Sequence, residues 1–250
     1  MIENTILKKN KSGVKALTFA LTFPSAQLVE LAAQAGFDAI NLDGEHGTFS
    51  PESVDLICRV ANGYGMSVTA RVPNIQPNTI NLFLDRGIQG ITGPHIESRE
   101  EAQALADACL FPPGGKRSWG GGRGTEFNDD RKLNEAYGGK LSFAKWSNQN
   151  MLVWAQIESK KAHDNLDGIL SVTGLSGITG GPNDFAASLG HPGEPDHPER
   201  QRLTADAEAR ARAAGKRVAS DLSLGLAIQD LLLVRSRRFV EEHQSVPVGP

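Results

Sequence analysis

The chain has 250 residues, of which 39% are hydrophobic and 22% are charged, a composition typical of a globular protein with a sizeable core. Its 26 basic and 29 acidic side chains give a net charge of −3, which excludes a strongly basic nucleic-acid-binding protein and a polybasic membrane-binding surface. No apolar run reaches the length of about 18 residues that a membrane span needs. The two cysteines, Cys58 and Cys109, are too few for a disulfide framework, so we expect reduced thiols and a cytoplasmic protein.

Short β-rich segments alternate with helical patterns along the chain. The first helix should begin after Ser25 and end at Gly36, the second should begin at Pro51, and the third should follow Ser98, with Glu101 completing a capping box. The sequence from 196 to 215, rich in Ala, Arg and Glu, predicts a further, solvated helix. Strands are expected at residues 14–23, 37–43, 66–72, 88–92, 151–157, 176–179, 216–219 and 222–228.

About eight strands separated by helices predict a parallel sheet. For a chain of this length the leading fold is an α/β (β/α)8 TIM barrel, and a doubly wound open sheet is the alternative. One barrel domain should cover residues 1–250.

Two segments depart from this pattern. Residues 111–150 form a long Gly-rich insertion, which we expect to be a mobile loop over the active site. Arg117 and Arg123 within it could bind an acidic substrate, although solvated arginines are the favoured interpretation. Near Ser220–Asp221 no helix fits between two strands, whereas a parallel crossover needs about a dozen residues. One βα connection is therefore shortened near residues 218–222.

Polar residues follow several of the expected strands at the edge where a barrel carries its active site. They are Asp43, Glu45 and His46 after the second strand, Arg71 at the end of the third, Gln156 and Glu158 at the fifth, and Asn183 and Asp184 after the sixth. We expect these side chains to converge.

This set of residues predicts a site for a hard divalent cation. Glu158 and Asp184 supply carboxylate oxygens, which Mg²⁺ and Mn²⁺ prefer. A 2-oxo acid could chelate such an ion, which would act as a Lewis acid on the enolate. Arg71 could stabilise the developing negative charge, and His46 could transfer a proton.

Each residue also has an ordinary structural interpretation. Asp184 and Glu158 could be acids at helix starts, His46 could be a surface residue, and Arg71 could pair with a nearby acid. A Schiff-base mechanism is disfavoured because the only lysines on or beside strands, Lys15 and Lys216, are poorly placed for it.

The sequence resembles the metal-dependent (class II) pyruvate aldolases of the 4-hydroxy-2-oxoheptanedioate and 2-dehydro-3-deoxyglucarate aldolase group, which are related to the citrate lyase β-subunit. The stretches that carry the resemblance span roughly residues 30–200 and are GFDAINLDGEHG, ARVP, LFLDRGIQGITGPHIESREEA, FPPGGKRS, QIESKKAHDNLDGILSV and GGPNDFAASLG.

The resemblance implies a role for each matching residue. His46 would be the proton-transferring base, Arg71 the arginine that stabilises the enolate, and Asp85 an acid that raises the basicity of the histidine. Glu158 and Asp184 would be the metal ligands. Gln156, Asn183 and Asp184 would contact the substrate.

The predicted activity is reversible cleavage of a 4-hydroxy-2-oxo acid to pyruvate and an aldehyde, through a metal-bound pyruvate enolate with Mg²⁺, Mn²⁺ or Co²⁺. The resemblance also implies a homo-oligomer, since proteins of this family form hexamers. No nucleic-acid or membrane partner is expected. Two alternatives stay open: another lyase or decarboxylase of the superfamily acting on a carboxylated or CoA-linked substrate, and a catalytically silent barrel used for binding or assembly.

Overall fold

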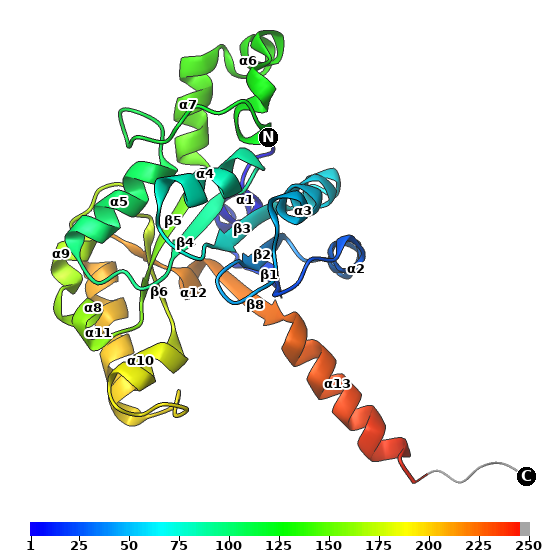
Figure 1. Ribbon diagram of the computed structural model, residues 1–250, viewed down its shortest axis with the longest axis vertical. Coiled ribbons are helices and arrows are strands. Elements are labelled where there is room, and N and C mark those ends of the chain that lie inside the picture. The colour runs from blue at the N-terminus through cyan, green and yellow to red at the C-terminus, as the bar shows by residue number, and fades with distance from the viewer. Residues whose placement is uncertain (246–250) are drawn as a thin grey trace, which may run out of the picture.

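The computed structural model describes residues 1–245, so the last five residues of the expected domain lie outside the described part of the chain. Its centre is a curled sheet of eight parallel strands in the order β7-β6-β5-β4-β3-β2-β1-β8 (Figure 1). The expected strands are all present: β1 (Ala16–Leu21), β2 (Ala39–Asp43), β3 (Ser67–Arg71), β4 (Gly90–Gly93), β5 (Leu152–Ile157), β6 (Gly177–Gly180), β7 (Arg217–Val218) and β8 (Ser223–Ala227).

The expected closed barrel is wrong, because β7 and β8 do not pair with each other. β8 pairs with β1 from Ala16↔Ser223 to Ala20↔Ala227, and the four-residue helix α12 (Ala219–Leu222) is all that separates it from β7. This connection is too short for a parallel crossover, so the shortened segment predicted near residues 218–222 leaves a half-barrel open along one seam. The doubly wound alternative is also wrong, since the strand order follows the chain from β1 to β7 without a reversal.

The helices predicted after Ser25, at Pro51 and after Ser98 begin where expected, but the expected capping box at Ser98 is wrong, because the carboxylate of Glu101 accepts the N–H of Glu97 instead. Ser25 accepts a hydrogen bond from the N–H of Leu28, and Gly36 ends that helix in the left-handed region. Ser50 and Ser53 form a capping box. The helices are α1 (Thr5–Asn10), α2 (Ala26–Ala35), α3 (Pro51–Gly63), α4 (Pro77–Asp85), α5 (Arg99–Cys109), α6 (Asp130–Tyr137), α7 (Lys140–Gln149), α8 (Lys160–Asp164), α9 (Leu166–Leu170), α10 (Pro182–Ser188), α11 (Pro198–Ala213) and α13 (Ile228–His243). Among residues 1–245, none is long and apolar enough to cross a membrane.

The insertion at residues 111–150 is an ordered substructure rather than a mobile loop. It contains the 3-10 helix η1 (Arg123–Asn128) together with α6 and α7, which project from the body of the molecule (Figure 1). Phe143 is fully buried there, and its ring lies 4.9 Å from that of Tyr137 and 5.9 Å from that of Trp119. Aromatic packing of this kind holds the insertion together.

The glycines of this insertion allow the chain to lie against the C-terminal end of α4. A Cβ atom at Gly120 would lie 2.6 Å from Oδ2 of Asp85, and one at Gly124 would overlap the carbonyl oxygen of Leu84. Because α4 runs back from the end of β3 to the start of β4, this contact lies at the edge of the sheet where the strands begin. The expectation of a loop over the active site is therefore wrong. Arg117, which belongs to the insertion, is buried, so the favoured interpretation of a solvated arginine is wrong for it, and burial lowers the pKa of its guanidinium to about 10.

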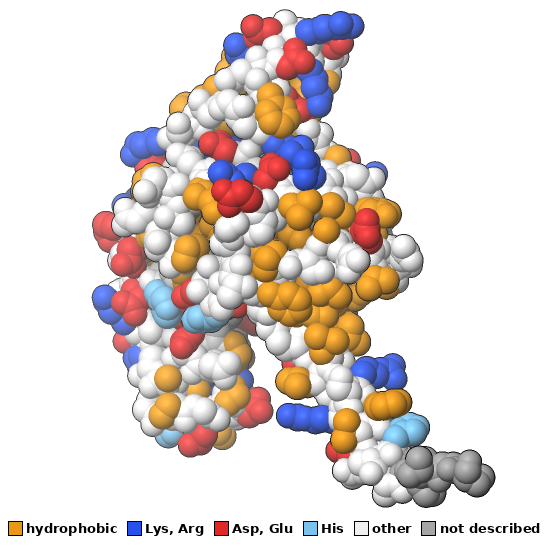
Figure 2. Space-filling model, turned by 45° about the vertical axis from the view of Figure 1, so that its right-hand side comes forward, with side chains coloured by type: hydrophobic (Ala, Val, Ile, Leu, Met, Phe, Trp, Pro, Cys, Tyr) orange, Lys and Arg blue, Asp and Glu red, His pale blue; other side chains and the backbone are white. Residues whose placement is uncertain are grey.

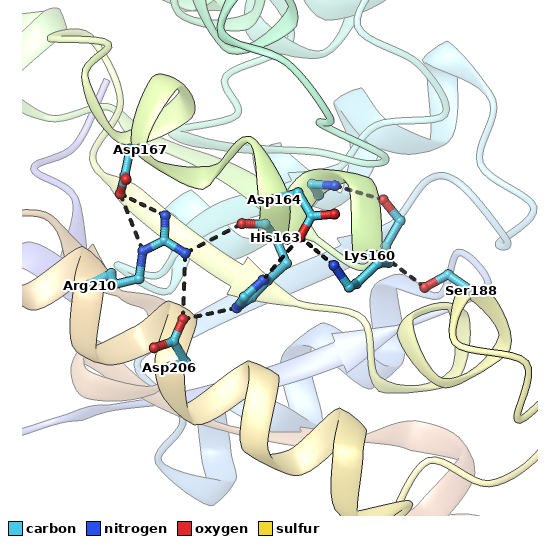
Figure 3. Close-up of polar contacts among 9 residues, drawn as sticks. Lys160, His163, Asp164, Asp167, Ser188, Asp206 and Arg210 are labelled. Carbon is cyan, nitrogen blue, oxygen red and sulfur yellow. Dashed lines mark hydrogen bonds and ion pairs between the residues drawn. The ribbon is translucent and has the colours of Figure 1, made fainter.

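A polar network joins α11 to the short helices α8 and α9 (Figure 3). His163 Nε2 lies 2.9 Å from Asp206 Oδ2, and Arg210 donates to Asp167 Oδ1 at 2.7 Å. On the same helix, Leu203, Ala207 and Ala211 are buried. The helix expected from 196 to 215 is thus amphipathic rather than solvated on all sides, and it holds β7 in place through its buried face.

The side of the sheet next to the open seam is uncovered. On the outer face, Leu17, Leu224 and Leu226 are exposed, at the position that a crossover helix would otherwise cover. Helix α13 extends away from the body (Figure 1), and its Leu233 and Phe239 are also exposed. Figure 2 shows hydrophobic side chains gathered where α13 leaves the body.

The close approach at Gly124 predicts a strong effect of one added methyl group. Gly124→Ala should lower the free energy of unfolding by about 1–3 kcal/mol, because the new Cβ atom has to displace backbone atoms of α4. Gly121→Ala is the matched control, since its Cβ atom would meet nothing closer than 3.7 Å. Urea denaturation measures both; equal midpoints for the two variants would contradict the packing described here.

Candidate active site

The C-terminal ends of the strands surround a cavity of about 500 Å³. Most of the residues predicted from the strand ends line it: Asp43, His46, Arg71, Gln156, Asn183 and Asp184. The convergence expected from the sequence is therefore confirmed for these side chains. Glu158 follows β5 directly and is buried at this edge of the sheet, with 2% of its surface exposed.

Arg71, at the end of β3, is fixed by two acids. Its Nε and Nη2 atoms donate to the carboxylate of Asp43 at 3.0 and 2.6 Å, and its Nη1 lies 2.9 Å from Oε2 of Glu45. Burial opposes ionisation of Asp43, but the hydrogen bonds from Arg71 hold the pKa of this carboxyl below its usual value. The guanidinium is therefore oriented and permanently charged beside the cavity. The ordinary interpretation of Arg71, an ion pair with a nearby acid, is confirmed.

Glu158 is held in place from both sides. Its Oε1 accepts a hydrogen bond from the backbone N–H of His95 at 2.8 Å, and its Oε2 accepts one from Nε2 of Gln156 at 2.5 Å. Burial raises the pKa of Glu158, the N–H and charge of His95 oppose this rise, and the carboxylates of Asp184 and Glu45 add to it. The buried carboxylate of Glu158 thus lies near enough to two further acids to be affected by their charge, although Asp184 itself is exposed.

Gly181, directly after β6, leaves room for the carboxylate of Glu158. A Cβ atom at this position would overlap Oε2 of Glu158 and lie 2.7 Å from Nε2 of Gln156. Gly181 is also the N-cap of α10, and no side chain caps this helix. Asp184 is an acid in the first turn of α10, as its ordinary interpretation proposed, and it also lines the cavity.

The residues present fit a hard divalent cation. The donors are carboxylate oxygens of Glu158 and Asp184, with the carboxylate of Glu45 close to Glu158, and hard cations favour such ligands. A bound ion of charge +2 would offset the repulsion that raises the pKa of Glu158. These residues could hold the ion while the open cavity admits further oxygen ligands.

His46 lies in the loop after β2, where its backbone N–H donates to Oδ1 of Asp43 at 3.2 Å. Its side chain is 64% exposed, and its Nε2 lies 3.8 Å from Oε2 of Glu45. The imidazole can therefore reach both solvent and the cavity that it lines, as a group that moves protons must.

Asp85 does not lie with this group. It is the last residue of α4 and lies against Gly120 and Gly122, at the edge of the sheet where the strands begin. Burial raises the pKa of its carboxyl, while Arg117 and Arg86 lower it. Within one chain, Asp85 and His46 are therefore at opposite ends of the sheet.

Strand-end reasoning missed His95, which follows β4. It adopts a left-handed backbone conformation with φ of 49°, rare for a residue other than glycine. Its Nδ1 lies 3.2 Å from Oε1 of Glu158 and its Nε2 lies 3.3 Å from Oε1 of Glu45. The rule that located the other residues also applies here, because His95 comes two residues after the end of the fourth strand.

The two lysines considered for Schiff-base chemistry lie elsewhere. Lys216 donates to the carbonyl oxygens of Val172 and Leu175 at 2.6 and 3.0 Å, and Lys15 donates to the carbonyl of Ser220 at 2.7 Å. Neither of them lines the cavity.

Comparison with known proteins identifies the family. The model of the HpcH/HpaI aldolase/citrate lyase family matches residues 17–241. The 4-hydroxy-2-oxovalerate aldolase of Rhodococcus jostii (strain RHA1) is 36% identical over 215 residues, which are 85% of this chain and 79% of that protein. The 2-keto-3-deoxy-L-rhamnonate aldolase of Escherichia coli (strain K12) is 30% identical over 217 residues, 86% of this chain and 78% of that protein.

A solved structure shows the same fold. The HpcH/HpaI aldolase of Desulfitobacterium hafniense DCB-2 superposes with a TM-score of 0.85 at 24% identity, over 98% of this chain and 99% of that one. The resemblance noted from the motifs is thus confirmed, and with it the expectation of an enzyme of the aldolase type, a carbon–carbon lyase. The chain belongs to the HpcH/HpaI aldolase/citrate lyase family.

Proposed function

We propose that this chain is a metal-dependent aldolase that cleaves a 4-hydroxy-2-oxo acid to pyruvate and an aldehyde and also catalyses the reverse addition. The observation that carries the proposal is the buried carboxylate of Glu158, with Asp184 and Glu45 beside it and a fixed arginine at the same cavity. The names of the relatives, aldolases of short 2-oxo acids and of deoxy sugar acids, agree with this activity.

In this proposal, Glu158 and Asp184 hold the divalent cation, which can be Mg²⁺, Mn²⁺ or Co²⁺. When bound, the cation acts as a Lewis acid toward the 2-oxo acid. Gln156 and Asn183 line the same cavity and are positioned to contact the substrate. Gln156 also donates to Glu158, so it orients the carboxylate.

Arg71 and His46 carry out the charge and proton steps. His46 accepts the proton of the 4-hydroxyl group, the C3–C4 bond breaks to release the aldehyde, and the electron pair of that bond forms the pyruvate enolate. The guanidinium of Arg71, held by Asp43 and Glu45, stabilises the negative oxygen of the enolate. Return of a proton to C3 gives pyruvate.

The alternatives are less well supported. A silent binding protein has no need for a buried carboxylate with two other acids near it, an arrangement that costs stability unless a cation binds. A lyase or decarboxylase acting on a CoA-linked substrate would need cationic side chains for the phosphates, whereas Arg71, the one cationic side chain among the cavity residues, is bound by two acids.

We also propose that the protein is a cytoplasmic homo-oligomer. Leu17, Leu224 and Phe239 are among the exposed apolar side chains beside the open seam and on α13, and such surfaces favour association. Asp85 lies far from His46 of its own chain, so the role that the family resemblance gives it would need a second copy. Both cysteines are free and buried, and burial raises the pKa of each thiol to about 12, which suits a reducing compartment.

The proposed chemistry predicts metal-dependent exchange of the methyl protons of pyruvate. In D₂O the protein should exchange them for deuterium, because formation and reprotonation of the enolate need no aldehyde. A chelator should abolish the exchange and Mn²⁺ or Mg²⁺ should restore it, as followed by NMR. Exchange that persists in the chelator would contradict a metal mechanism.

Substitutions at the proposed cation site should lower the exchange rate, whereas a similar substitution far from it should not. Glu158→Gln and Asp184→Asn should each lower the exchange rate by about 10³-fold, the loss expected when several kcal/mol of charge stabilisation are removed. Glu135→Gln, an exposed acid of α6, is the matched control and should exchange at the rate of the unmodified protein.

The raised pKa of Glu158 predicts how the stability of the metal-free protein depends on pH. A carboxyl with a higher pKa when folded binds more protons in the folded state, so the free energy of unfolding falls as pH rises from the usual range of a glutamate through the raised pKa. Glu158→Gln should remove this part of the dependence. Denaturation of the metal-free proteins between about pH 4 and 8 tests the sign. If the free energy of unfolding changed with pH in the same way for both proteins, folding would not raise the pKa of Glu158.

A further inference from the structure

We propose a second metal site, for Zn²⁺ or a similar borderline ion, in the loop between α10 and α11. One ligand atom from each of His191, His197 and Glu199 lies within 4.8 Å of the other two. Within residues 1–245 this is the only such group of three histidine, cysteine or acidic side chains. It is separate from the carboxylates of Glu158 and Asp184 and does not depend on the aldolase proposal.

The donor atoms select the ion. Two imidazole nitrogens and one carboxylate oxygen form a ligand set that suits Zn²⁺, with water in the fourth position. Mg²⁺ prefers oxygen ligands and keeps its waters, so it should not compete for this loop. The two proposed sites therefore differ in chemistry: oxygen donors at the cavity and mainly nitrogen donors in the loop.

The loop holds its donors in a backbone of little freedom. Pro192 and Pro195 in the loop and Pro198 at the start of α11 fix φ at three positions. The N–H of Glu194 donates to the carbonyl of His191 at 3.2 Å, and the N–H of His197 donates to that of Glu194 at 3.0 Å. Little conformational entropy would therefore be lost on binding an ion.

The two imidazole rings are already in contact. Their centroids lie 3.5 Å apart with an angle of 16° between the planes, and Nδ1 of His197 is buried without a hydrogen-bond partner among the described residues. A buried polar atom without a partner needs an explanation, and a metal ion supplies one. The lone pair of each nitrogen lies in the plane of its ring, so two stacked rings do not point their lone pairs at one ion. To bind it, one ring has to rotate about its Cβ–Cγ bond, a torsion with a broad energy minimum.

The charge of the loop favours a cation. Glu194, Asp196 and Glu199 give it three acidic side chains, and Arg200 lies 4.0 Å from Asp196. The remaining negative charge attracts a divalent ion. Once bound, the ion would link the end of α10 to the start of α11, since His191 follows α10 and Glu199 lies in the first turn of α11.

The test counts zinc ions per chain in the full-length protein. Metal-free protein is dialysed against Zn²⁺ buffered with a competing chelator, and bound zinc is measured by mass spectrometry. The variants are His191→Asn/His197→Asn, in which the loop site is removed, and Glu158→Gln/Asp184→Asn, in which the cavity site is removed. His243→Asn, on exposed α13, is the matched control. Circular dichroism confirms that each variant is folded.

The unmodified protein and the His243→Asn control should bind two zinc ions per chain, and each double variant should bind one. In the Glu158→Gln/Asp184→Asn protein, zinc X-ray absorption should show two imidazole nitrogens at about 2.0 Å. If that protein binds no zinc, or if His191→Asn/His197→Asn binds as much as the unmodified protein, the loop site is wrong. A single zinc that is lost only with the two histidines would support the loop site and show that the oxygen donors of the cavity do not take up zinc.

Discussion

The burial of one carboxylate beside two others is the interaction on which the account of this protein depends. Glu158 is 2% exposed, accepts hydrogen bonds from His95 and Gln156, and has its pKa raised by burial and by nearby acids. Such an arrangement costs free energy in an isolated chain. A bound divalent cation would offset this cost, which makes the carboxylate of Glu158 a candidate ligand.

The parallel sheet brings the required groups to one edge. Arg71, Gln156 and Glu158 are at or directly after the ends of β3 and β5, so a single structural rule places a guanidinium, an amide donor and a buried carboxylate together. The open seam between β7 and β8 lies beyond these strands. The lost connection therefore alters the outer surface, where Leu224 and Leu226 are exposed, without removing a predicted site residue.

Much of this arrangement could be predicted from the sequence, because strand periodicity, capping residues and the polar residues after each strand are local features. The strands, the cavity residues and the shortened connection near residue 220 follow from them. Three features do not. The packing of the Gly120–Gly124 segment against α4 and the location of Asp85 depend on contacts distant in sequence. The position of His95 follows from the same rule, but its contacts with Glu158 and Glu45 depend on a left-handed backbone conformation, with φ of 49°, that no local motif specifies.

The most direct test of the cation site is a crystal structure of the protein grown with Mn²⁺, examined by anomalous scattering at the manganese edge. The account predicts an anomalous peak between the carboxylates of Glu158 and Asp184, with oxygen ligands at about 2.0–2.2 Å, close to those of similar hard cations. A structure in which the two carboxylates point apart, with manganese bound elsewhere or absent, would contradict the central claim.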